Sequence, residues 1–197
     1  MKHYTARMHS DLFGTPPVRE AITHNVFFGI VPDADACART ARAVERLKTA
    51  HGAPGRWLKP DRYHLTLHFL GAFSELPQER IDVARRAAQS VAAAAFELSL
   101  DRAGHFSKGI GWLGCAHVDA PLQGLWSELH KALAHERVAT QGHARFVPHV
   151  TVLRDAREPL PAQPISPIVW PVREFVLIDS VLGARNEYRP LGRWTLS

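Results

Sequence analysis

The sequence predicts an α+β fold of antiparallel strands with helices on the outer faces, arranged in two lobes. Three observations support this prediction. Buried strands alternate with amphipathic helices, one helix-then-strand unit is used twice, and both copies of that unit end in the pattern His-x-Thr-x. Repetition of one unit indicates two lobes related by an approximate two-fold axis.

The elements follow from local spacing. Apolar runs or alternation predict strands, and apolar residues three or four apart predict helices. In chain order, we expect a strand at 24–32, a helix stripe at 37–47, a strand at 55–71, a helix stripe at 81–95, strands at 96–100 and 109–118, a helix stripe at 122–133, a strand at 144–154, and closing strands at 173–183 and 188–197. Residues 159–171 contain five prolines, and we expect an irregular surface loop there.

Composition restricts the class of protein. The chain has 197 residues, enough for one sizeable core, and we expect a flexible extension at 1–23 followed by a single bilobal domain at 24–197. No apolar run reaches the ~20 residues of a membrane span, so a cytoplasmic location is expected, with a monomer as the default. The formal charge of +5 favours anionic partners such as RNA or nucleotides.

The two internal His-x-Thr-x copies are His64-Leu65-Thr66-Leu67 and His149-Val150-Thr151-Val152. Side chains alternate along a strand, so the His and Thr of each copy share one face, roughly 6.6 Å apart at Cα, while the apolar residues face the core. A third His-x-Thr, at residues 3–5, lies in the expected extension and shows that the bare triplet means little. Strand context and repetition distinguish the internal copies, which we expect to face one cleft.

Two facing imidazoles suit attack at phosphorus. One neutral histidine can take a proton from the nucleophile while a protonated one donates to the leaving oxygen, because an unperturbed pKa of about 6.5 populates both forms near neutrality. Threonine hydroxyls can donate to the non-bridging phosphate oxygens. We therefore predict His64 and His149 as catalytic residues and Thr66 and Thr151 as phosphate ligands, with no cofactor and no metal.

With these motifs, the chain resembles the two-histidine phosphoesterases, and among them the RNA 2′,3′-cyclic phosphodiesterases, also called 2′-5′ RNA ligase-like proteins. The resemblance covers nearly everything after residue 24 and implies two antiparallel sheets around a central cleft. It implies hydrolysis of RNA ends with a 2′,3′-cyclic phosphate to a 2′-phosphate, with 2′-5′ ligation as a reverse-type reaction in some members. It also implies that His64 donates the proton to the leaving oxygen and His149 activates water.

Three neighbours of the motifs are less clear from the sequence. Arg154 could hold a phosphate bidentately, but strict alternation turns it away from His149, so this role requires a bulge or strand end that re-aims it. His68 shares a strand face with His64 by the same alternation, yet two histidines without a third ligand are too few for a metal site. Arg62 leads into the first motif and is a candidate for a basic rim of the cleft.

Other functions remain open at the level of sequence. The same scaffold could hold a nucleotide or RNA without turning it over, or act on small cyclic nucleotides or 2′-5′ linked oligonucleotides. A metal-dependent phosphodiesterase is disfavoured, because the sequence lacks clustered carboxylates and H-x-D or D-x-H spacings.

Overall fold

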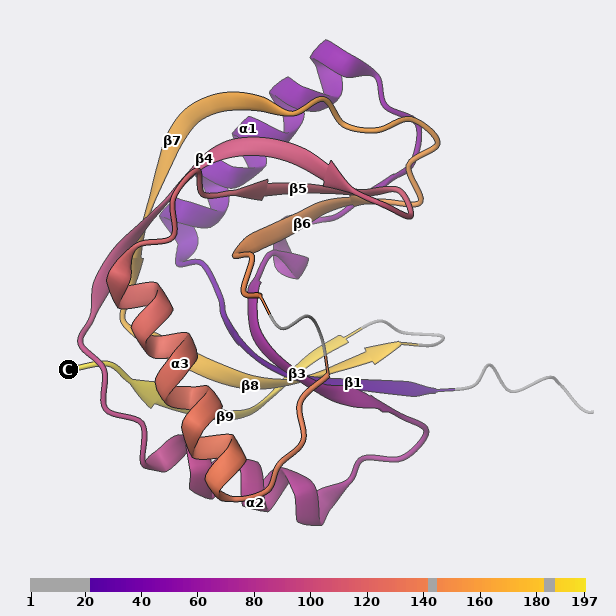
Figure 1. Cartoon of the computed structure of the whole chain (residues 1–197). Helices are drawn as coiled ribbons and strands as arrows, with labels where there is room; N and C mark the ends of the chain where they lie inside the picture. The colour runs from indigo at the N-terminus through magenta and orange to yellow at the C-terminus, as the bar shows by residue number, and fades with distance from the viewer. Residues whose placement is uncertain (1–21, 142–144, 183–186) are drawn as a thin grey trace, which may run out of the picture.

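The computed structural model describes residues 22–141, 145–182 and 187–197 and confirms the α+β architecture (Figure 1). Its helices are α1 (Ala34–His51), the short η1 (Pro60–Arg62), α2 (Gln78–Gln89) and α3 (Ala120–His135). Its strands are β1 (Thr23–Ile30), β2 (Arg56–Trp57), β3 (Leu65–Phe73), β4 (Phe96–Phe106), β5 (Ile110–Gly114), β6 (His149–Arg154), β7 (Gln163–Val172), β8 (Glu174–Leu182) and β9 (Glu187–Thr195).

The strands form two four-stranded halves that the backbone joins into one open antiparallel sheet. The order is β7-β4-β5-β6 in one half and β3-β1-β8-β9 in the other, with the short β2 beside β6. In the described residues, β3 and β6 meet through one register pair, Leu65 with Val150. The two expected sheets are therefore two halves of a single sheet, and the strands that carry the motifs lie at the junction.

The helices pack on the outside of these halves. Helix α1 follows β1 in the chain but packs against β7 of the other half, while α2 and α3 pack against each other and reach β9 and β3 (Figure 1). Asp33 caps α1, its carboxylate accepting from the Ala36 backbone N–H at 2.7 Å, and Gly52 ends the helix in the left-handed conformation. The leucines of α3 are buried at a helical spacing, as the sequence predicts.

A second, smaller apolar cluster lies apart from the main core. Phe27, Val176 and Ile178 are buried in it, with Phe69 and Tyr188 packed against them. These residues come from β1, β3, β8 and β9, so the cluster belongs to one half of the sheet. Residues of this cluster pack around His64, the histidine of the first motif.

The expected surface loop at 159–171 is wrong in its larger part, because residues 163–172 form strand β7. This strand lies at the sheet edge, where a proline removes no ladder hydrogen bond if its nitrogen points outward. The second helix is also shorter than its stripe predicts. It ends at Gln89, so Val91 and Ala95 lie outside it.

The expected N-terminal extension, residues 1–23, falls almost entirely on residues 1–21, outside the described part of the chain. Of the remaining two residues, Thr23 begins β1. Within the described ranges, no helix has both the length and the apolar character needed to cross a membrane.

Candidate active site

The structure brings the two motifs together at the junction of the sheet halves. Leu65 and Val150, the middle residues of the two His-x-Thr triplets, are antiparallel partners. In each motif the histidine and the threonine flank this pair on its two sides, so all four side chains lie at the junction. Both histidines and both threonines are partly exposed, whereas Leu65 and Val150 are buried on the opposite face.

A β-bulge follows the threonine in each motif. On β3 the register against β1 passes from Thr66 to His68, so Leu67 is the extra residue, and on β6 the register against β5 passes from Thr151 to Leu153, so Val152 is extra. An extra residue reverses the alternation of every side chain after it. The motifs thus share both their sequence pattern and the irregularity that follows it.

The bulge at Val152 has a direct consequence for Arg154. It turns Leu153 into the core, where that side chain is fully buried, and leaves Arg154 exposed on the face of His149 and Thr151. The positive charge of Arg154 lowers the pKa of both motif histidines, which is consistent with this placement. The bulge therefore turns Arg154 in the direction that a phosphate-binding role requires.

The bulge at Leu67 moves His68 to the face opposite His64, so the expectation that the two histidines share a face is wrong. His68 is buried, its Nε2 lies 2.9 Å from the carbonyl oxygen of Trp126, and its ring stacks on the Trp126 indole. The indole Nε1 of Trp126 donates in turn to the carbonyl oxygen of Leu67 at 3.1 Å. Helix α3 thus holds the bulged residue directly, and His68 is part of the packing beneath the site.

The two motif histidines have the same backbone anchor. Nδ1 of His64 lies 3.0 Å from the carbonyl oxygen of Arg62, and Nδ1 of His149 lies 2.8 Å from that of Val147. A carbonyl oxygen can only accept, so each Nδ1 carries the proton and donates. Each neutral imidazole therefore keeps its lone pair on Nε2, the nitrogen that can take a proton from a reactant.

Aromatic side chains hold both rings in place. Phe27 stacks on His64 with ring centroids 4.6 Å apart, and Phe106 meets His149 edge to face at 4.8 Å. Such contacts add about 0.5–1.5 kcal/mol to simple burial and limit ring rotation. Nothing in the local sequence pattern distinguishes these two phenylalanines from other core aromatics, so the sequence alone does not predict their role.

Tyr188 on β9 is a further site residue, which no sequence pattern indicates. Its hydroxyl lies 2.8 Å from Nδ1 of His64 and donates to the Arg62 carbonyl oxygen at 3.3 Å. The Arg62 guanidinium lies 3.7 Å from the centroid of the Tyr188 ring and donates to Ser180 Oγ at 3.1 Å. Tyr188 and Ser180 are antiparallel partners, so β8 and β9 together fix this contact. Arg62, a candidate for the basic rim of the cleft, packs on the residue beside His64.

The environment of both histidines favours the neutral imidazole in the free protein. Burial lowers the pKa of His64 to about 4, and the positive charges of Arg154, Arg62 and His149 act in the same direction. Burial and Arg154 also lower the pKa of His149. Burial raises the pKa of the Tyr188 hydroxyl, which therefore stays protonated near neutrality. The site combines neutral bases with fixed positive charge, which suits an anionic ligand.

The described residues contain no group of three or more His, Cys, Asp and Glu side chains arranged to hold a metal ion. The groups that the two motifs and Arg154 bring to the junction are two imidazoles, hydroxyl groups and a guanidinium. These groups can accept a proton, donate a proton and bind a phosphate.

Two curated relatives match most of the chain. Over 178 residues, the chain is 32% identical to the RNA 2′,3′-cyclic phosphodiesterase of Escherichia coli, covering 87% of this chain and 96% of the relative. It is 28% identical over 134 residues to the RNA 2′,3′-cyclic phosphodiesterase of Thermotoga maritima, covering 65% of this chain and 68% of that protein.

Solved structures give the same relationship. The crystal structure of E. coli LigT complexed with 3′-AMP matches with a TM-score of 0.72 and 29% identity, over 89% of this chain and 98% of LigT. LigT complexed with phosphate matches with a TM-score of 0.68 and 30% identity, over the same shares of the two chains. The family model described as the 2′-5′ RNA ligase superfamily matches residues 32–183. The chain therefore belongs to the 2′-5′ RNA ligase superfamily.

Proposed function

We propose that this protein hydrolyses the 2′,3′-cyclic phosphate at RNA ends to a 2′-phosphate, using His64 and His149 and no metal ion. The observation that carries the proposal is the junction itself, where two His-x-Thr-x motifs meet through the Leu65–Val150 pair. The names of the relatives and the LigT structure with 3′-AMP support the substrate class.

In the proposed reaction, Nε2 of His149 takes a proton from water as the water oxygen attacks phosphorus. The bond from phosphorus to the ribose 3′ oxygen breaks, and protonated Nε2 of His64 donates its proton to that oxygen. His149 gains one proton and His64 loses one. At the end of the reaction His149 is protonated and His64 is neutral. The 2′ oxygen keeps the phosphate.

Charge on the transferring phosphate is stabilised by hydrogen bonds. Hydroxyl groups of Thr66 and Thr151 donate to the non-bridging oxygens, and the guanidinium of Arg154 adds two further donors. These assignments rest on the shared face of the motifs and on the bulge after Thr151.

Protonation of His64 depends on the substrate in this proposal. In the protein without ligand, burial lowers the pKa of His64 to about 4, far below neutrality. A bound phosphate monoanion favours the imidazolium and so raises that pKa, because an opposite charge within a few ångströms stabilises the charged form. Substrate binding therefore favours protonation of His64, and the protonated form is the one that acts as the acid. With the 5′-hydroxyl of a second RNA as nucleophile in place of water, the same two groups would form a 2′-5′ linkage, His149 taking the proton of that hydroxyl and His64 again donating to the 3′ oxygen as its bond to phosphorus breaks.

A monomer that acts in the cytoplasm is part of the same proposal, on the sequence grounds given above. Its substrate would be RNA ends, with small cyclic nucleotides as the competing class.

The test is incubation of the full chain, with EDTA, with an oligonucleotide that ends in 2′,3′-cyclic phosphate, followed by separation of 2′- and 3′-phosphate products. We expect 2′-phosphate alone. Absence of turnover of this RNA, with turnover of 2′,3′-cyclic mononucleotides, would shift the substrate to small cyclic nucleotides. Binding without any turnover would support a non-catalytic module, and formation of 3′-phosphate would contradict the direction of ring opening.

A further inference from the structure

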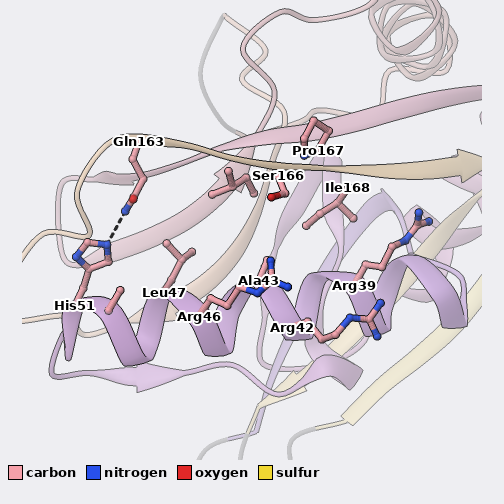
Figure 2. Close-up of a pocket in the computed structure, with 12 residues that line it drawn as sticks. Arg39, Arg42, Ala43, Arg46, Leu47, His51, Gln163, Ser166, Pro167 and Ile168 are labelled. Carbon is pink, nitrogen blue, oxygen red and sulfur yellow. Dashed lines mark hydrogen bonds between the residues drawn. The ribbon is translucent and has the colours of Figure 1, made fainter.

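A second basic feature lies away from the motif histidines, in a groove between α1 and β7. The groove has a volume of about 390 Å³, within the range of small-ligand sites (Figure 2). Three arginines of α1 line it, Arg39, Arg42 and Arg46, spaced so that they share one flank of the helix. At the far end, His51 Nε2 accepts a hydrogen bond from Gln163 Nε2 at 2.6 Å and links the helix to the strand.

The positive charge of this flank is largely uncompensated. Arg39 forms an ion pair with Asp35 at 2.9 Å and donates to the Val169 carbonyl oxygen. Within the described ranges, neither Arg42 nor Arg46 has an ion pair, and both are exposed. The planar guanidinium groups of such a row can bind phosphate oxygens bidentately.

The opposite wall is shaped by an irregularity in β7. Its register against β4 passes from Ile168 to Pro164, so Ile165, Ser166 and Pro167 have no partner in β4. The floor is apolar, with Leu47 and Ile168 buried at the base of the groove. A cationic rim over an apolar floor fits a ligand that combines phosphates with flat, weakly polar rings.

We propose that this groove binds single-stranded RNA at nucleotides away from the reacting end. From Arg39 to His51 the lining covers about 18 Å of helix, which is longer than the distance between neighbouring phosphates of a single strand. An elongated row therefore suits a strand better than one nucleotide. The inference rests on the proposed function for the identity of the ligand, and it selects RNA over small cyclic nucleotides as the substrate.

The position of α1 sets the length of RNA required. The other flank of the helix faces η1, where Cys37 Sγ lies 3.5 Å from the Pro60 carbonyl oxygen, and η1 leads directly into His64. Helix α1 thus separates the groove from η1, the segment that leads into the first motif. The groove is apart from the motif site, so we expect only an RNA longer than a terminal nucleotide or a very short oligonucleotide to occupy both.

The experiment compares Arg42→Gln/Arg46→Gln with a control that removes two positive charges elsewhere, Arg86→Gln/Lys131→Gln. The control residues are exposed on α2 and α3. Glutamine keeps a long side chain over the apolar floor, and thermal unfolding checks that each variant is folded. Binding is measured by fluorescence anisotropy with RNAs of roughly 4 and roughly 16 nucleotides that end in a 3′-hydroxyl, so the result does not depend on turnover.

We expect the groove variant to bind the longer RNA at least about tenfold more weakly, with the control nearly unchanged. Its slope of log affinity against log salt should be smaller in magnitude by about 1.4, for two lost phosphate contacts. Unchanged affinity for the longer RNA, an equal loss in the control, or an equal loss for the short RNA would each overturn the proposal. Because the probes are not hydrolysed, a failed cyclic-phosphate assay would leave this result standing.

Discussion

The hydroxyl oxygen of Tyr188 lies 2.8 Å from Nδ1 of His64, on the side of the ring opposite the nitrogen available for catalysis. Among the hydrogen bonds of the described residues, His149 has only the Val147 carbonyl oxygen at its Nδ1. The two motifs are therefore alike in sequence and in their bulges but differ in this partner. An asymmetric partner is a physical means of giving two similar histidines different roles.

Replacing Tyr188 by phenylalanine tests that difference. We expect kcat for cyclic-phosphate hydrolysis to fall about tenfold with little change in KM, because the ring still packs while the hydroxyl that orients His64 is lost. The acidic limb of the kcat/KM profile should also move. Tyr63→Phe is the matched control. Tyr63 directly precedes His64 in the sequence and is buried, and within the described residues its hydroxyl forms no hydrogen bond. Equal kinetics for both variants would remove Tyr188 from the mechanism.

Removing either histidine should abolish most turnover without unfolding the protein. His64→Asn and His149→Asn are each expected to lower kcat by about 10² to 10⁴, the usual contribution of general acid or base catalysis. Asparagine retains a polar group that can bond the Arg62 or Val147 carbonyl oxygen. Steady-state kinetics with circular dichroism as the fold control make the measurement. A folded variant with full activity would show that its histidine takes no part.

The motifs could be predicted from the sequence to a greater extent than the residues that surround them in the fold. The pairing of His64 with Thr66 and of His149 with Thr151 follows from strand alternation, which is local. The three helices and most strands also have local signals, namely apolar spacing and caps. These features depend on residues close together in the chain, so sequence patterns predict them.

The features that sequence missed depend on register between distant segments. A bulge at Leu67 or Val152 leaves no mark in the apolar pattern, yet it decides that His68 is buried and Arg154 is not. Tyr188 reaches His64 only because β9 pairs with β8 at Ser180. β7 likewise forms a strand, despite its prolines, because it lies at an edge of the sheet.

Arg154→Gln should shift the pH dependence of the reaction. The wild-type profile of kcat/KM is expected to be bell-shaped with its maximum below about pH 6.5, because the pKa of each histidine is lowered in the free protein. Loss of the Arg154 charge removes one cause of that lowering, so both limbs should move to higher pH. KM should also rise if Arg154 binds phosphate. An unshifted profile would show that Arg154 does not act on the histidines.

The lowered pKa of His64 also predicts acid sensitivity of the fold. In the unfolded chain the imidazole titrates near 6.5, while in the folded protein it titrates near 4, so between these values the unfolded state binds more protons. Stability is therefore full above about pH 6.5 and is lost as the pH falls toward 4, by up to about 3 kcal/mol from this group. Urea unfolding across this range should show a steeper fall in the free energy of unfolding for the wild type than for His64→Asn, which lacks the titrating ring. His68 and His149 are unchanged in the variant and leave it some acid sensitivity of the same sign. Parallel curves for the two proteins would mean that His64 is not held neutral by the fold, and the proposal that bound phosphate raises its pKa would then lose its basis.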